Sequence, residues 1–144
     1  MATFTKVNDF VEALAEKLHN LGSDQLVVAL SNTAPASESS NPTADGNGVL
    51  ANVTQIAYTN LSSRNITTDA SAQTSGTYKL TLTDLVLTAS GGAVADFRYV
   101  YIYNDTASND ELIAVYDYGS TVSLADGDTF TIDFDGTNGV LTIA

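Results

Sequence analysis

The chain has 144 residues and contains no cysteine, no tryptophan and only two prolines. Without cysteine it can form neither a disulfide framework nor a thiolate metal site, which fits folding in a reducing cytoplasm. The length is close to the commonest size of a single domain and is sufficient to bury one core. We therefore expect residues 1–144 to form one domain.

Basic residues are also scarce. Seventeen acidic residues face five basic ones, which gives a net charge of −12. A protein that binds phosphates needs clustered lysines and arginines, whereas here they are scattered singly. An anionic membrane surface would repel such a chain as well. We therefore expect neither nucleic acid nor a membrane as a partner.

The sequence has no long apolar run. Nothing approaches the roughly 18 consecutive apolar residues of a spanning helix. Near the N-terminus, Asp9, Glu12 and Glu16 interrupt the apolar residues, so no signal-peptide pattern forms. We expect a soluble protein made in the cytoplasm.

Residues 4–21 are predicted to form one amphipathic helix. Thr3 or Thr5 can cap its start, and Gly22 suits the left-handed position that ends helices. His19 lies away from the apolar face and is expected to face solvent. The apolar residues recur at three- and four-residue steps that place them on one face: Phe4, Val7, Phe10 or Val11, Leu14, Leu18 and Leu21.

Residues 31–48, SNTAPASESSNPTADGNG, have no apolar pattern that could build a core. Structureless segments of this length inside a compact domain are usually functional arms or disordered. The segment is predicted to be an extended arm or loop. Two alternatives stay open: a free surface loop, or an arm that lies on a neighbouring molecule.

The remaining residues, 49–144, are rich in β-strand patterns. In residues 97–103, FRYVYIY, Phe97 and the three tyrosines fall on one face, while Val100 and Ile102 fall on the other. Both faces are apolar or aromatic, so both are expected to be covered. One cover is a second sheet, and the other is a helix, a loop or another subunit. We favour the N-terminal helix or a neighbouring copy.

Turns divide this region into about seven short strands. A register change, most simply a β-bulge, is expected near Thr83 and Asp84. Residues 90–92 are predicted to turn, and Asp126-Gly127 to form a tight hairpin-type turn. The prediction is a mainly β fold, an antiparallel β-sandwich of the jelly-roll or immunoglobulin-like kind, with one N-terminal amphipathic helix.

Motifs for chemistry are few. Nucleophilic catalysis needs a base, and His19 is the only histidine. Arg98, inside the aromatic strand, is expected to pair with an acid such as Asp117 or to lie on a tyrosine ring. We expect no catalytic residue, no cofactor and no dedicated metal site. Weak candidates for a structural calcium ion are the carboxylates of acidic turns, Asp126, Asp128, Asp133 and Asp135, whose spacing departs from the EF-hand loop.

Four segments are similar to a known family: LSNTAP (30–35), SGTYKLTLTDLVLTASGG (75–92), FRYVYIYNDTA (97–107) and DYGSTVSLADGDTFTIDF (117–134). With the N-terminal helix they resemble small virion structural proteins of tailed bacteriophages, of the capsid decoration (cement) kind. The resemblance covers nearly the whole chain, and no single motif in it is diagnostic. It implies a β-sandwich that coats the shell as an oligomer and carries no catalytic residue.

From this resemblance we expect a non-enzymatic protein on the outer surface of the phage head. Its partners would be the major capsid protein and other copies of itself. Two alternatives are a tail, fibre or receptor-binding component and a carbohydrate-binding β-sandwich module. The residues predicted to serve as core and contact between subunits are Tyr99, Tyr101, Tyr103, Tyr116 and Tyr118.

Overall fold

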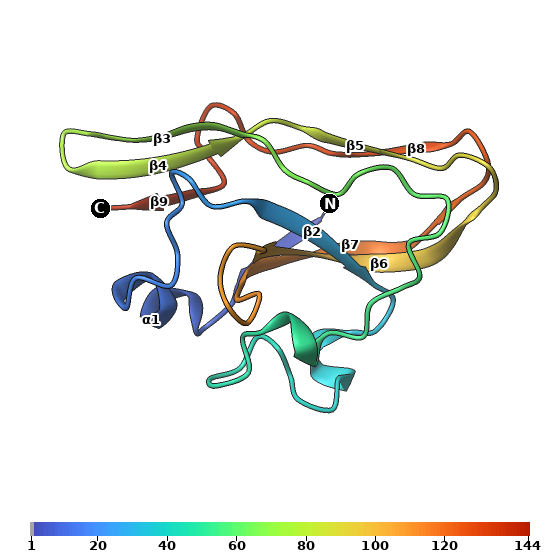
Figure 1. The fold of residues 1–144 in the computed structure, drawn as a ribbon, viewed down its shortest axis with the longest axis horizontal. Coiled ribbons are helices and arrows are strands. Elements are labelled where there is room, and N and C mark those ends of the chain that lie inside the picture. The colour runs from blue at the N-terminus through green and yellow to red at the C-terminus, as the bar shows by residue number, and fades with distance from the viewer. Residues whose placement is uncertain (1) are drawn as a thin grey trace.

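The computed structural model describes residues 2–144 and consists mainly of antiparallel β-sheets (Figure 1). The mainly β prediction is thus confirmed. The described residues form one α-helix, α1 (Phe10–Ala15), and two 3-10 turns, η1 (Pro35–Ser37) and η2 (Leu50–Asn52). They also form nine strands: β1 (Thr3–Lys6), β2 (Leu26–Ser31), β3 (Thr68–Thr74), β4 (Thr77–Leu82), β5 (Leu85–Thr88), β6 (Val94–Asn104), β7 (Leu112–Leu124), β8 (Thr129–Ile132) and β9 (Leu141–Ile143).

The strands form three antiparallel sheets. The largest has the order β1-β7-β6-β2, and two smaller sheets have the orders β3-β4-β9 and β5-β8. The two smaller sheets lie together on one side of the four-stranded sheet (Figure 1). The long strands β6 and β7 hold the four-stranded sheet together, since β6 also pairs with β2 and β7 with β1.

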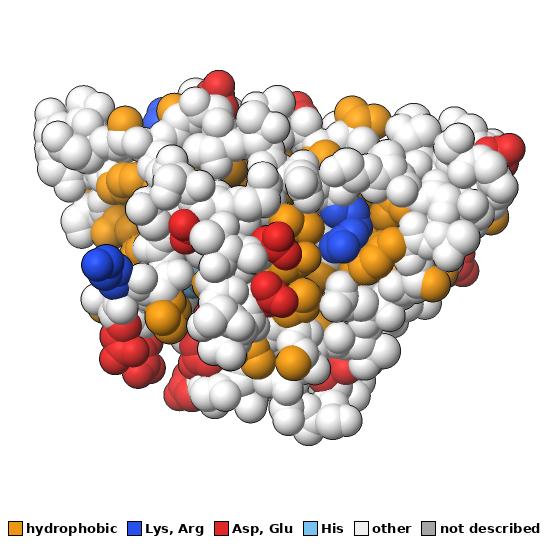
Figure 2. All heavy atoms as spheres, in the orientation of Figure 1, with side chains coloured by type: hydrophobic (Ala, Val, Ile, Leu, Met, Phe, Trp, Pro, Cys, Tyr) orange, Lys and Arg blue, Asp and Glu red, His pale blue; other side chains and the backbone are white. Residues whose placement is uncertain are grey.

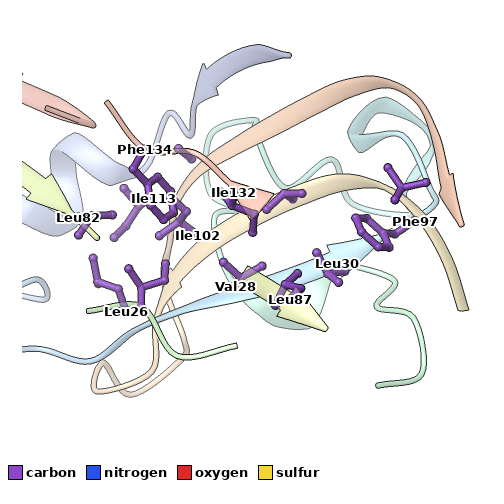
Figure 3. Close-up of a cluster of buried hydrophobic side chains, with 14 of the residues drawn as sticks. Leu26, Val28, Leu30, Leu82, Leu87, Phe97, Ile102, Ile113, Ile132 and Phe134 are labelled. Atoms are coloured by element: carbon purple, nitrogen blue, oxygen red, sulfur yellow. The ribbon is translucent and has the colours of Figure 1, made fainter. Parts of the chain in front are cut away.

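The main core fills the space between these two layers. Alternate residues of β2 and β6, such as Val28 and Ile102, point from the four-stranded sheet toward Leu82 of β4 and Leu87 of β5 (Figure 3). All four of these side chains are at most 3% exposed. Because successive side chains of a strand point to opposite faces, the residues that alternate with these on β2 and β6 point to the other face of the four-stranded sheet.

Those intervening residues form a second, smaller core on the opposite face of the four-stranded sheet. Val27 and Ala29 of β2 pack there with Tyr99, Tyr101 and Tyr103 of β6. The prediction that both faces of the aromatic strand are covered is therefore confirmed. Phe97 was placed with the tyrosines by alternation, and this was wrong, because it belongs to the main core.

Phe97 lies on the opposite face from the tyrosines because the register between β6 and β7 is irregular. Phe97 pairs with Val122, but Tyr99 pairs with Asp117, so β7 has three more residues than β6 in this interval. Gly119 in the bulged part has a φ of 94°, a left-handed conformation that favours glycine. An irregularity of this kind changes which face a side chain meets.

The second core is covered by a loop of the same chain. Ala34, Leu50 and Val53 pack against its tyrosines, and the loop lies on the side of the four-stranded sheet opposite the smaller sheets (Figure 1). The favoured covers, the N-terminal helix or a neighbouring copy, were therefore wrong. The loop was one of the alternatives for this cover.

Hydrogen bonds hold residues 31–48 against their own chain. The Asp9 carboxylate accepts bonds from the backbone N–H groups of Gly46 and Gly48, both at 2.8 Å. The Glu38 carboxylate accepts bonds from the Thr54 N–H at 2.8 Å and the Thr54 hydroxyl at 2.7 Å. The segment is thus a loop that is anchored to its own chain, and not a free surface loop.

The prediction of one long helix over residues 4–21 is wrong. Residues 3–6 form strand β1, and α1 spans only Phe10–Ala15. The helix ends in a Schellman motif, in which the Lys17 N–H bonds to the Leu14 carbonyl and the Leu18 N–H to the Ala13 carbonyl. Lys17 has a φ of 68°, so it occupies the left-handed position expected for Gly22.

The predicted register change at Thr83–Asp84 and the predicted turn at Asp126-Gly127 both join different sheets. The break at Thr83–Asp84 is where the chain leaves the β3-β4-β9 sheet for the β5-β8 sheet, and no bulge within one sheet is needed. Asp126-Gly127 does turn, but β7 and β8 on its two sides belong to different sheets. It is therefore not a hairpin, and this prediction was wrong.

Candidate functional site

The five tyrosines predicted for core and subunit contact divide into two groups. Tyr99, Tyr101 and Tyr103 are buried by the chain's own loop, with 8%, 0% and 4% of their surface exposed. Tyr116 is half-buried, and Tyr118 is 44% exposed. The first three are core residues, and the last two remain candidates for contact with another molecule.

Tyr116 and Tyr118 belong to a cluster of rings at one edge of the molecule. Phe4 of β1 lies opposite Tyr116 of β7 in the sheet, and their rings meet edge to face at 5.2 Å. The ring of Tyr118 meets that of Phe130 in the same way at 5.3 Å, and Phe130 in turn contacts Phe97 of the main core. We call Phe4, Tyr116, Tyr118 and Phe130 the aromatic surface.

A hollow of about 340 Å³ lies between the two layers at this surface. Residues of β6 and β7 form one wall of it and residues of β8 form the other. Phe4, which contacts Tyr116, is 43% exposed. Burial raises the pKa of Tyr116, so its hydroxyl stays neutral at physiological pH. The hollow is lined by Ala2, Val100, Tyr116, Tyr118, Phe130, Thr131, Ile132 and Asp133.

An ion pair lies beside this surface. The Arg98 guanidinium donates two hydrogen bonds to the Asp117 carboxylate, at 2.7 and 2.9 Å, and lies 5.3 Å from the Tyr99 ring centroid. Both partners predicted for Arg98 are therefore confirmed. The bonds from Arg98 lower the pKa of Asp117, so the pair stays charged down to acidic pH. Asp117 lies next to Thr3 of β1 in the sheet.

The two outer edges of the four-stranded sheet differ. Along β2, the segment 56–66 supplies partners: the Val28 N–H bonds to the Arg64 carbonyl, and the Leu30 carbonyl accepts from the Ile56 N–H. The Tyr58 hydroxyl accepts from the Leu30 N–H at 3.0 Å. Figure 2 shows apolar side chains around a basic group on the face that it views. The Arg64 guanidinium lies 3.8 Å from the Tyr58 ring centroid.

At the other edge, β1 ends the sheet, and no described residue of 2–144 pairs with it as a further strand. Its four residues, Thr3–Lys6, are all exposed. An unpaired strand edge offers backbone N–H and C=O groups to another chain. The aromatic surface and this open edge are adjacent, because Phe4 belongs to both.

His19 is not the solvent-facing residue that the helix prediction implied. It is 5% exposed, because the chain turns inward after the early end of α1. Its Nδ1 lies 3.1 Å from the Asn104 amide nitrogen, and Nε2 has no partner among the described residues. Burial lowers the pKa of His19, although the charges of Glu111 and Asp24 raise it in part.

Three of the four calcium candidates accept hydrogen bonds from backbone N–H groups. Asp126 accepts a bond from the Gly91 N–H and Asp128 from the Ala125 N–H. Asp135 accepts from the backbone N–H and the side-chain amide of Asn138 and from the Thr137 N–H, and these bonds lower its pKa. Asp133 lines the hollow at the aromatic surface. Across residues 2–144, no three acidic, histidine or cysteine side chains are grouped to hold a metal ion.

Sequence reasoning missed Phe4 and Phe130 as surface residues. Phe4 was placed on the apolar face of a helix, although the alternation Thr3-Phe4-Thr5 is typical of a strand. Phe130 was placed on a half-buried strand, and it is indeed half-buried. The sequence pattern could therefore have placed Phe4 on a strand. That Phe130 lies at the surface follows only from how the β5-β8 sheet lies against the four-stranded sheet.

Comparisons with protein-family models, curated proteins and solved structures found no match to this chain. In the described part of the chain, no helix is both long and apolar enough to cross a membrane.

Proposed function

We propose that this chain is a structural protein of a tailed-phage virion, which decorates the outer surface of the head and stabilises the capsid through protein–protein contacts. In this proposal it is a non-enzymatic β-sandwich of the jelly-roll or immunoglobulin-like kind, made in the host cytoplasm. Its partners are the major capsid protein and other copies of itself.

One observation carries the proposal: the aromatic surface lies beside an open strand edge. Phe4 and Tyr118 expose 43% and 44% of their surface, and they are the exposed members of one cluster of contacting rings at the edge of the sheet. Buried aromatic side chains supply much of the energy of protein interfaces, and each such anchor typically contributes more than about 1 kcal/mol. The arrangement therefore suits contact with another protein.

The acidic charge fits a role in which the free protein stays dispersed. A net charge of −12 keeps free copies apart in solution. Binding to a shell then requires apolar contacts that outweigh the repulsion, and these can be individually weak because they are repeated over many copies.

The test uses phage heads that lack the decorating protein. Purified chain should bind them and raise the temperature at which they rupture. The Tyr118→Ala variant should bind at least about tenfold more weakly, because it removes one exposed anchor. Val11→Ala is the matched control, since Val11 is 55% exposed on α1, away from the aromatic surface. Heads that stay bare in the presence of the wild-type chain would refute the proposal.

A carbohydrate-binding module is the second candidate. The exposed Tyr118 ring and the Asp133 side chain both line the hollow, and a ring beside a carboxylate suits stacking on a sugar and bonding to its hydroxyls. A glycan-array signal that Tyr118→Ala abolishes would favour this function. Binding to whole host cells, but not to heads, would favour a tail or receptor-binding component instead.

A further inference from the structure

We propose that a second copy of this chain occupies the open edge of β1, so that two four-stranded sheets join into one eight-stranded sheet. The inference rests on the proposed function in taking the aromatic surface as a protein-contact site, and it names the partner at that site. It is tested on the purified chain alone, so it can fail separately.

The open edge has defined hydrogen-bonding groups. The Val7 N–H points toward β7 and bonds to the Ile113 carbonyl at 3.1 Å, while the Asn8 N–H points away from β7 and bonds to the Thr43 carbonyl. Since backbone groups alternate between the two sides of an antiparallel strand, the N–H groups of Phe4 and Lys6 also point away from β7. The loop covers the edge at Asn8 and leaves it open at Phe4 and Lys6.

A two-fold axis at Phe4 uses this open stretch. Phe4 then lies opposite Phe4 of the second copy, and Lys6 lies opposite Ala2, so the two lysines stay apart. A register centred on Thr5 would instead leave Ala2 opposite Asn8, whose N–H is already bonded. The Phe4-centred register therefore pairs more backbone groups and places two aromatic rings side by side.

The same axis brings the two aromatic surfaces together. In a continuous antiparallel sheet the two-fold axis is perpendicular to the sheet, so the smaller sheets of both copies lie on the same side. Phe4 and Tyr116 share a face of the sheet, and that face carries the main core. The hollow of each copy therefore faces that of the other, and pairing removes Phe4 and Tyr118 from water.

Charge does not oppose a second copy at this edge. Residues 2–7 contain no acidic residue and one lysine, although the chain has 17 acidic residues. Repulsion between two copies is therefore weak along this strand. Because the segment 56–66 covers the β2 edge, the joined sheet cannot grow further at its ends. The pairing closes as a dimer and does not continue as a fibre.

Sedimentation of the purified chain over a wide concentration range tests the dimer. Lys6→Pro removes an N–H that bonds to the second copy but not to β7, so the variant should fold and stay monomeric. Lys6→Ala, which keeps the N–H, should still dimerise. Phe4→Asp should weaken the dimer at least about tenfold. Its control, Ile143→Asp, alters a strand residue of similar exposure, 41%, and should leave the dimer intact.

Single cysteines test the register, because the natural chain has none. In the Phe4-centred register Thr3 lies opposite Thr5 of the second copy, in a pair without mutual hydrogen bonds and with Cα atoms about 4.5 Å apart. That distance suits a disulfide. A mixture of the Thr3→Cys and Thr5→Cys chains should therefore crosslink on oxidation. Each variant alone should not, because its cysteines would be roughly 8 Å apart.

The outcomes separate the inference from the proposed function. A chain that stays monomeric at every concentration refutes the inference, as does a dimer that survives both Lys6→Pro and Phe4→Asp. Crosslinking of Thr5→Cys alone would refute the Phe4-centred register. A dimer that does not bind heads leaves the inference standing and removes the proposed function. A monomer that binds heads does the reverse.

Discussion

Two tyrosines allow the same chemical change to be made with opposite expected results. Tyr58 and Tyr101 are both in or against the cores, and a change to phenylalanine removes one hydroxyl from each. The Tyr58 hydroxyl accepts from the Leu30 N–H at 3.0 Å and donates to the Gln55 side chain at 2.6 Å. The Tyr101 hydroxyl is buried without a hydrogen-bond partner among the described residues.

Tyr58→Phe should destabilise the protein. Leu30 is fully buried, and no other acceptor contacts its N–H on this edge of β2. A buried donor left without a partner costs about 1–3 kcal/mol. For a chain of this length, each kcal/mol lowers the melting temperature by about 3 °C. We therefore expect a fall in the melting temperature of roughly 3–9 °C.

Tyr101→Phe should leave the stability unchanged or raise it by up to about 2 kcal/mol, because it removes a buried polar group that has no bonding partner. Burial raises the pKa of Tyr101, so the hydroxyl stays neutral and no charge is lost with it.

Urea unfolding followed by far-ultraviolet circular dichroism measures both free energies, and equal slopes of the unfolding curves show that the folded and unfolded states are comparable. A loss of more than about 1 kcal/mol for Tyr101→Phe would show that this hydroxyl is bonded. An unchanged stability for Tyr58→Phe would show that the Leu30 N–H finds another acceptor.

Three further predictions concern single sites. Lys17→Gly should stabilise the protein by about 0.5–1 kcal/mol in thermal unfolding, because Lys17 has a φ of 68° that glycine adopts without strain. The free energy of unfolding should fall as the pH drops from 6.5, the ordinary pKa of histidine, to the lower pKa of His19 in the folded protein. The reason is that the unfolded chain takes up the proton at a higher pH than the folded chain does. Asp9→Ala should speed hydrogen exchange at the N–H groups of Gly46 and Gly48, since it removes their acceptor.

Each of these has a control within the chain. Lys17→Ala keeps a side chain on the strained residue and should gain nothing, so an equal gain for both variants would contradict the strain argument. His19→Gln should remove the fall in stability below pH 6.5, and its persistence would assign the fall to other groups. Asp45→Ala, which alters a neighbouring acid that bonds only to the Asn8 side chain, should leave the two glycine N–H groups protected.

Strand pattern was predictable from the sequence because it is local. The alternation in residues 97–103 indicated burial on both faces of a strand, and the structure confirms it. The pairing of Arg98 with Asp117 was also accessible, since an arginine within an apolar strand needs a counter-charge. The exchange of Phe97 to the other face was not, because a bulge between two strands depends on their relative lengths.

The predicted helix over residues 4–21 was wrong for a related reason. Residues 3–6 and 10–15 together fit a helical repeat, and the repeat itself does not reveal that β7 offers an edge to residues 3–6. Pairing with β7 outweighs the weak local preference for helix. His19 then becomes buried because α1 ends at Ala15 rather than at Leu21.

The sequence by itself determined that the chain is mainly β, strongly acidic and without a cluster of basic or thiol groups. It also determined which strand must be buried on both faces. Only the tertiary structure decided what covers each face, which rings stay exposed and which strand edge stays open. These depend on contacts between residues far apart in the chain. The periodicity of a segment states that a face needs a partner, but the partner is chosen by the packing of the whole molecule.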